Sequence, residues 1–81
     1  MIVRVHFFAV AKQRVGRSEI SIELPPNSAV ADLRAHLAEQ FPALADLLPQ
    51  VRLALNAEYV SDETLLSENC EAAIIPPVSG G

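Results

Sequence analysis

The C-terminal run Pro76-Pro77-Val78-Ser79-Gly80-Gly81 carries the chemistry that this sequence predicts. Glycine has no side chain, so a paired glycine lets the backbone approach another surface closely and enter a narrow space. The reactive group of such a segment is the α-carboxylate of Gly81. Because that carboxylate is ionised at neutral pH, it is a poor electrophile until it acquires a leaving group. Adenylation by ATP in a partner enzyme would supply one, and a sulfur nucleophile could then displace AMP to leave a thiocarboxylate.

The length of the segment suits insertion into a partner. An extended chain from Pro77 to Gly81 reaches about 17 Å, at ~3.4 Å per residue. We therefore predict a folded carrier domain over residues 1–76 and a flexible, inserting tail over residues 77–81. The inserting residues would be Pro77, Val78, Ser79, Gly80 and Gly81. A frayed terminus is the alternative that a Gly-Gly ending alone would favour.

Other residues with reactive side chains are few and scattered. His6, His36 and Cys70 are too widely spaced for a metal-ligand pattern, so no metal site is predicted. Cys70 has no cation near it in the sequence to activate the thiol, which favours a turn or half-buried position over a role as a sulfur relay. Both histidines are expected at the surface, with His6 on the same strand face as Arg4. No phosphate-binding loop or Ser-His-Asp grouping is visible, so we expect no catalysis by this chain alone.

Hydrophobic periodicity predicts the elements that position the tail. Strands are expected over residues 2–9, 18–24, 51–55, 59–60 and 71–76. A short helical turn over residues 10–15 would close at Gly16. The main helix would be capped by Ser28, carry Asp32 in its first turn and end at Pro42. Its buried stripe would consist of Val30, Leu33, Leu37 and Phe41.

The order of these elements is typical of an α+β fold, the β-grasp or ubiquitin-like architecture. It has a mixed sheet of about five strands and one main crossing helix, with the first and last strands parallel and adjacent. The run from Ala72 to Ile75 is apolar without alternation, which favours a central last strand covered on both faces. Leu65 and Leu66 would pack beneath a polar turn over residues 61–67.

Composition and charge indicate which kinds of partner and which cellular compartment are expected. The net charge of −4 argues against nucleic acid, whose binding needs clustered basic residues. The sequence has no long apolar run and no signal-peptide pattern at its start, so we expect neither a membrane span nor export. With a single cysteine, these features favour the cytoplasm. Phe8, Tyr59 and Ile75 are expected to point outward beside the exit of the tail and to form a partner surface.

Four segments carry a family resemblance: Val5-His-Phe-Phe-Ala9, Ser28-Ala-Val-Ala-Asp-Leu-Arg34, Leu55-Asn-Ala-Glu-Tyr-Val60 and Glu71-Ala-Ala-Ile-Ile-Pro-Pro-Val-Ser-Gly-Gly81. They resemble the small, sulfur-carrying subunits of molybdopterin synthase along the whole chain. The resemblance implies that a ubiquitin-activating-like adenylyltransferase consumes ATP to adenylate Gly81. A sulfurtransferase would then supply the sulfur for the thiocarboxylate. No cofactor would be bound permanently.

The resemblance also implies a heterotetramer with the molybdopterin synthase large subunit, which would hold the active site. The tail would insert there and pass sulfur to cyclic pyranopterin monophosphate, while Phe8, Tyr59 and Ile75 pack against that subunit. One departure is the turn Asn69-Cys70-Glu71, where the family usually has Gly-Asp-Glu. Asparagine tolerates the left-handed conformation, so we expect the turn to persist without the contacts of the aspartate.

Three other functions remain open from the residues. A sulfur carrier of the thiamin pathway would share the fold, the tail and the activation chemistry, although the Pro-Pro-Val-Ser run favours molybdopterin synthesis. A ubiquitin-like protein modifier would join its tail to lysines of other proteins, but with Lys12 as its single lysine it could hardly build polymers on itself. A passive binding module would use the sheet and leave the tail without chemistry.

Overall fold

The structure, a computed structural model, describes residues 1–77; Val78, Ser79, Gly80 and Gly81, predicted as the end of the tail, lie outside the described residues. Within residues 1–77, five strands, two α-helices and a short 3-10 helix follow one another. In order they are β1 (Ile2–Phe7), α1 (Ala9–Val15), β2 (Glu19–Glu23), α2 (Val30–Gln40), η1 (Pro42–Leu44), β3 (Arg52–Leu55), β4 (Glu58–Tyr59) and β5 (Cys70–Ile75).

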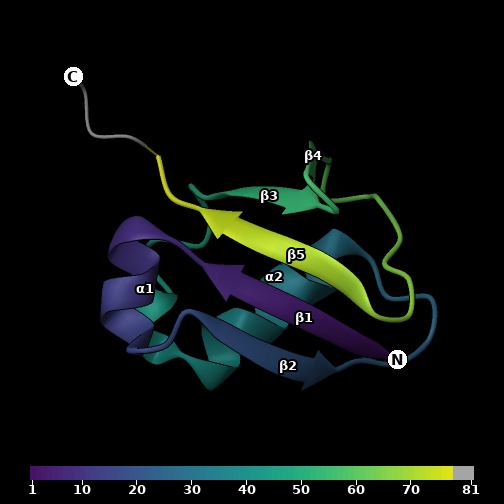
Figure 1. The fold of residues 1–81 in the computed structure, drawn as a ribbon, viewed down its shortest axis with the longest axis horizontal. Helices are drawn as coiled ribbons and strands as arrows, with labels where there is room; N and C mark the ends of the chain where they lie inside the picture. Colours follow the sequence, from purple (N-terminus) through teal and green to yellow (C-terminus); the bar gives the residue numbers. More distant parts are fainter. Residues whose placement is uncertain (78–81) are drawn as a thin grey trace.

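The strands form one mixed sheet in the order β2-β1-β5-β3-β4 (Figure 1). Strand β1 is antiparallel to β2 and parallel to β5, with Val3 opposite Cys70 and Phe7 opposite Ile74. Strand β3 is antiparallel to both β5 and β4. The parallel pairing of the first and last strands, with α2 behind the sheet in the crossover, confirms the predicted β-grasp architecture.

The core lies between the sheet and the helices. Alternation along β1 turns three side chains toward the helices, and α2 supplies the facing stripe at helical spacing. The residues with zero exposure are Val3, Val5, Ala11, Val30, Leu33, Leu37, Ala72 and Ile74. Phe41, at the end of α2, is half-buried and meets the buried Phe7 edge to face, with ring centroids 5.8 Å apart. The predicted helical stripe is therefore confirmed.

The helix ends show one correct and one wrong prediction. Helix α1 ends at Gly16, whose φ of 81° is left-handed and whose N–H donates to the carbonyl of Lys12, as predicted. Helix α2 is capped at Ala29, and the prediction of a Ser28 cap was wrong. The Asp32 carboxylate accepts the N–H of Ala29 at 2.8 Å, while the buried Ser28 hydroxyl donates to the Pro25 carbonyl at 2.7 Å. Ser28 thus closes the preceding turn, because its side chain points inward.

The predicted burial of Leu65 was also wrong. Leu66 is buried, whereas Leu65 is 62% exposed. Leu65 forms an isolated antiparallel bridge with Ala29, and the N–H of Leu66 donates to the carbonyl of Ser28. Because successive residues of an extended segment point to opposite sides, only one of the two leucines can face the core.

The prediction that both faces of the last strand are covered was wrong as well. In β5, Cys70, Ala72 and Ile74 are buried against the helices. Glu71 on the opposite side is exposed, and the two other outward residues, Ala73 and Ile75, are half-buried. The described part of the chain places its helices on one side of the sheet only, so the apolar run continues onto a face that lacks a helical cover. No helix within residues 1–77 is both long and apolar enough to cross a membrane.

Candidate functional site

The side of the sheet that faces away from the helices is called here the open sheet face. Strand register assigns its members, since partners that sit opposite each other share a face. They are Ile2, Arg4 and His6 of β1, Glu19, Ser21 and Glu23 of β2, Glu71, Ala73 and Ile75 of β5, Arg52 and Ala54 of β3, and Tyr59 of β4. Phe8 continues β1 one residue beyond its last pair with β5 and is therefore level with Ile75.

One end of the open sheet face is apolar and lies where β5 leads into Pro76 and Pro77. Phe8 is 50% exposed and Tyr59 is 57% exposed, as predicted, while Ile75 is half-buried. Single exposed apolar residues are common, but a large aromatic pair on one side of a sheet is typical of a contact surface. That these three residues contact a partner stays a prediction.

Two hollows lie on the open sheet face. One has a volume of about 440 Å³ and is lined by His6, Phe8, Asn56, Ala57, Glu71 and Ala73. The other has a volume of about 370 Å³ and is lined by Gln50, Arg52, Tyr59, Ile75, Pro76 and Pro77. Phe8 therefore lines one hollow, whereas Tyr59 and Ile75 share the other at the start of the predicted tail.

The first hollow has a strained edge. The hairpin between β3 and β4 turns through Asn56 and Ala57, which have φ values of 48° and 72°. Two successive left-handed residues make the tight turn that suits the twist of a hairpin, where Asn-Gly is the preferred sequence. Ala57 therefore adopts a conformation that favours glycine.

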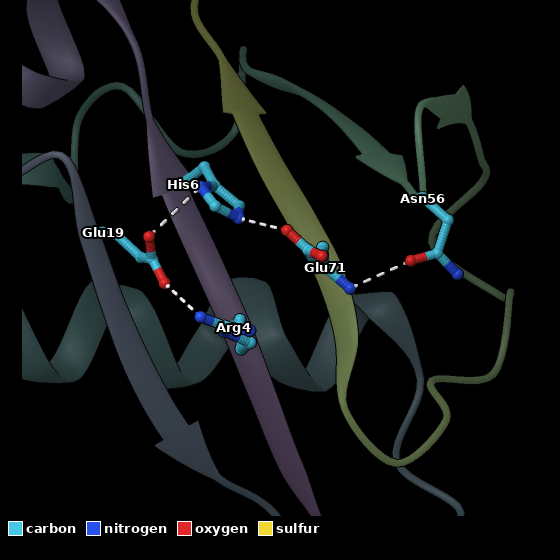
Figure 2. A network of polar contacts seen from close by, with 5 residues as sticks. All are labelled: Arg4, His6, Glu19, Asn56 and Glu71. Atoms are coloured by element: carbon cyan, nitrogen blue, oxygen red, sulfur yellow. Dashed lines mark hydrogen bonds and ion pairs between the residues drawn. The ribbon is translucent and has the colours of Figure 1, made fainter.

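The other end of the open sheet face is polar and internally paired (Figure 2). Arg4 Nη2 donates to Glu19 Oε2 at 3.1 Å, and His6 Nδ1 lies 3.9 Å from the other oxygen of the same carboxylate. On its other side, His6 Nε2 lies 2.8 Å from Glu71 Oε1. The N–H of Glu71 donates to Asn56 Oδ1 at 3.1 Å. This network spans the sheet from β2 to the end of β3, so every charge in it has an opposite charge or a dipole close by.

Sequence reasoning found only part of this network. The shared face of His6 and Arg4 was predicted and is confirmed. The contact between His6 and Glu71 joins residues that are 65 positions apart, and it depends on the parallel register of β1 and β5. The sequence predicted that these two strands pair. It did not predict their register, which decides that Glu71 lies beside His6.

A second contact missed from the sequence joins Arg52 to Tyr59. The guanidinium carbon of Arg52 lies 3.9 Å from the centroid of the Tyr59 ring, in the geometry of a cation–π interaction. Register places Tyr59 opposite Ala54, which makes Arg52 its diagonal neighbour on the same face. The ring therefore holds the cation at the hollow beside Pro76 and Pro77.

The cysteine and the second histidine, Cys70 and His36, lie outside the polar network of the open sheet face. Cys70, predicted in a turn or half-buried, is the first residue of β5 and is buried. Asn69 before it has the predicted left-handed conformation, with a φ of 61°. His36 is half-buried, and its Nε2 lies 3.1 Å from Gln40 Oε1. Within residues 1–77, no group of three or more His, Cys, Asp or Glu side chains could hold a metal ion.

Comparison with known proteins adds sequence relatives over almost the whole chain. The model of the ThiS family matches residues 5–81. A molybdopterin synthase sulfur carrier subunit from Caenorhabditis briggsae is 38% identical over 98% of this chain and 96% of its own length. Another, from Chlamydomonas reinhardtii, is 37% identical over 100% of both chains.

Solved structures show the same fold. One is a chain in the complex of subunits 1 and 2 of the molybdopterin-converting factor from Helicobacter pylori, with a TM-score of 0.73 and 27% identity over 100% of both chains. Another is the small archaeal modifier protein 1 from Methanosarcina acetivorans, with a TM-score of 0.85 and 26% identity over 99% of this chain and 96% of that one. Similar chains thus include a member of a two-subunit complex and a protein modifier.

Proposed function

This chain belongs to the ThiS family and to the molybdopterin synthase sulfur carrier subunits, and from that membership we propose that it carries sulfur as a thiocarboxylate on Gly81. Two observations together carry the proposal. The sequence ends in Gly80-Gly81, and it is 37–38% identical, over nearly its full length, to proteins that bear this name. The geometry supports the proposal, because the exposed side chains of Phe8 and Tyr59 and the half-buried Ile75 lie toward the end of the sheet where β5 leads into that segment.

The proposed loading has two steps. In the first, the Gly81 carboxylate attacks the α-phosphorus of ATP in an adenylyltransferase, pyrophosphate leaves and an acyl-adenylate forms. In the second, sulfide-level sulfur supplied by a sulfurtransferase attacks the acyl carbon, a C–S bond forms and AMP leaves. The glycines contribute by being unobstructed, since any side chain beside the acyl carbon would hinder both attacks.

The proposed delivery takes place in a complex with the molybdopterin synthase large subunit. Phe8, Tyr59 and Ile75 would dock on that subunit, and the tail would enter its active site and pass sulfur to cyclic pyranopterin monophosphate. The chain of similar fold from Helicobacter pylori was solved in a complex with a second subunit, which supports such a pairing. This chain would supply the sulfur and the docking surface, while the large subunit would supply the catalytic groups.

Intact-mass measurement tests the proposal. The chain is incubated with ATP, sulfide and its adenylyltransferase, and the expected product is heavier by the difference between one sulfur and one oxygen atom. Deletion of Gly81, or addition of one residue after it, should abolish this product and the formation of the pterin dithiolene. A truncated chain that still supports dithiolene formation would overturn the proposal.

The similarity to an archaeal modifier favours a second candidate, attachment of Gly81 to lysines of other proteins. The same measurement separates the two functions, because a modifier would gain the mass of a second protein. A passive binding module would show neither product and would keep its activity without Gly81. The names of the curated relatives favour molybdopterin synthesis over the thiamin pathway.

A further inference from the structure

Arg52 differs from the other arginines whose ion pairs the structure shows. Three arginines hold a carboxylate of this chain within 3.1 Å: Arg4 with Glu19, Arg14 with Asp46 and Arg34 with Asp62. Within residues 1–77, no carboxylate lies within ion-pair distance of Arg52. It is exposed, and it belongs to the open sheet face.

The contact with Tyr59 holds this cation without neutralising it. The Arg52 Cζ lies over the Tyr59 ring, 3.9 Å from the ring centroid. The guanidinium carries five N–H donors, and within residues 1–77 the side-chain hydrogen bonds of arginines are made by Arg4, Arg14 and Arg34, so those of Arg52 are available to a partner. An arginine held against a ring has also lost part of its side-chain freedom before it binds a partner, which lowers the entropic cost of a new contact.

The position of Arg52 ties it to the start of the tail. Its register partner in β5 is Ile75, and both residues line one hollow with Pro76 and Pro77. The other arginine of the open sheet face, Arg4, holds the Glu19 carboxylate at 3.1 Å. Arg52 is therefore the described arginine of this face whose charge is available to a docked protein.

We propose that Arg52 binds a carboxylate, an aspartate or glutamate side chain, on the large subunit that docks on the open sheet face. The inference rests on the proposed function for the docking event and adds the charge of the contact. A guanidinium matches a carboxylate through two parallel N–H···O hydrogen bonds, which fix orientation as well as position. This contact at the start of the tail sets the register in which the tail enters the partner, and it discriminates against partners with a basic group there.

Affinity measurements on the large subunit test the assignment. We expect Arg52→Ala to weaken binding about fivefold and Arg52→Glu about fiftyfold, since charge reversal adds repulsion to the lost pair. Arg14→Glu is the matched control, because Arg14 is exposed and its guanidinium contacts Asp46 and the Ala43 carbonyl beside η1, away from the open sheet face. It should change affinity less than about twofold. Arg52→Glu binding within twofold of that control would overturn the proposal.

Salt dependence and rescue separate an ion pair from a merely structural role. The affinity of the native chain should fall more steeply with salt than that of Arg52→Ala, because the variant lacks the screened interaction. Replacement of the matching acidic residue of the large subunit by lysine should restore binding of Arg52→Glu. Equal salt slopes for the two chains would contradict the ion pair. Urea unfolding of Arg52→Ala should match the native chain.

Amidation of the C-terminus identifies the source of the carboxylate. A chain whose Gly81 carboxylate is replaced by a carboxamide lacks the chain's own terminal charge, and the effect of Arg52→Ala on affinity should persist. Its disappearance would show that Arg52 pairs within the chain and would overturn the proposal. Failure here is distinct from failure of the proposed function. If deletion of Gly81 abolishes sulfur transfer while Arg52→Ala leaves the affinity unchanged, the carrier function stands and only the proposal for Arg52 fails.

Discussion

The two faces of the sheet use the same strands for different purposes. On the helix side, β5 presents Cys70, Ala72 and Ile74, all buried. On the open side, the same strand presents Glu71, Ala73 and Ile75, which are exposed or half-buried. The apolar side chains of the first face are buried by the chain itself, whereas those of the second retain accessible area that another protein can bury. Residues one position apart are therefore expected to affect different quantities, folding stability on one face and partner affinity on the other.

Truncation on the helix side should give the largest effect and is the strongest test of this difference. Leu33 is fully buried in α2, so Leu33→Ala is expected to lower the free energy of unfolding by about 3 kcal/mol, through lost burial and the cavity left behind. Urea unfolding measures this change. Phe8→Ala, on the half-exposed Phe8, should cost less than about 0.5 kcal/mol. Similar losses for the two variants would erase the distinction between the faces.

A charge on the apolar end of the open sheet face gives the next largest effect. Phe8→Glu should weaken binding of the large subunit about 100-fold, because it places a desolvated carboxylate in the proposed contact. Its free energy of unfolding should stay close to that of the native chain. Leu65→Glu is the control, since Leu65 is also an exposed large apolar residue but lies outside the open sheet face. Calorimetry that shows equal affinity for both variants would rule out a docking role for Phe8.

The strained turn beside Phe8 should respond in the opposite direction. Ala57→Gly is expected to raise the free energy of unfolding by about 1 kcal/mol, because the φ of 72° is unfavourable for a residue with a Cβ. Ala35→Gly, at an exposed position inside α2, should lower it by about the same amount. Thermal unfolding of the two variants would show shifts of opposite sign. A destabilised Ala57→Gly would mean that the turn carries no such cost.

The smallest effect is expected in the polar network of the open sheet face. His6→Gln should lower the free energy of unfolding by no more than about 0.5 kcal/mol, because the pair with Glu71 is accessible to solvent. A double-mutant cycle with Glu71→Gln measures the coupling of the two side chains. A coupling of several kcal/mol would make this end of the open face a structural centre and would contradict the division of roles between the faces.

Much of the fold was predictable because local and global signals agree. Alternation in β1, the stripe of α2, the left-handed Gly16 and the left-handed Asn69 each follow from spacing or residue type. The errors arose where one pattern of apolar residues is compatible with two structures. An apolar run does not distinguish a strand buried by its own chain from one that keeps a face for another protein, so β5 was misjudged.

The candidate site was predictable only in outline. Exposure of Phe8 and Tyr59 followed from alternation and polar neighbours, and both are exposed. The stacking of Arg52 on Tyr59 depends on diagonal neighbours across β3 and β4, which the sequence does not specify until the register is known. Ser28 was predicted as the cap from its residue type alone. Its hydroxyl points inward and donates to the Pro25 carbonyl, and the helix is capped one residue later, at Ala29.

The central place of β5 has a mechanical consequence. Its backbone is bonded to β1 along one edge and to β3 along the other, so traction on the segment that follows Ile75 is resisted by both ladders together. Such a pull runs along the strand and loads these hydrogen bonds in shear rather than opening them one at a time. A molecule gripped and drawn by its carboxyl end would therefore resist unravelling better than one whose final strand lay at the rim of the sheet.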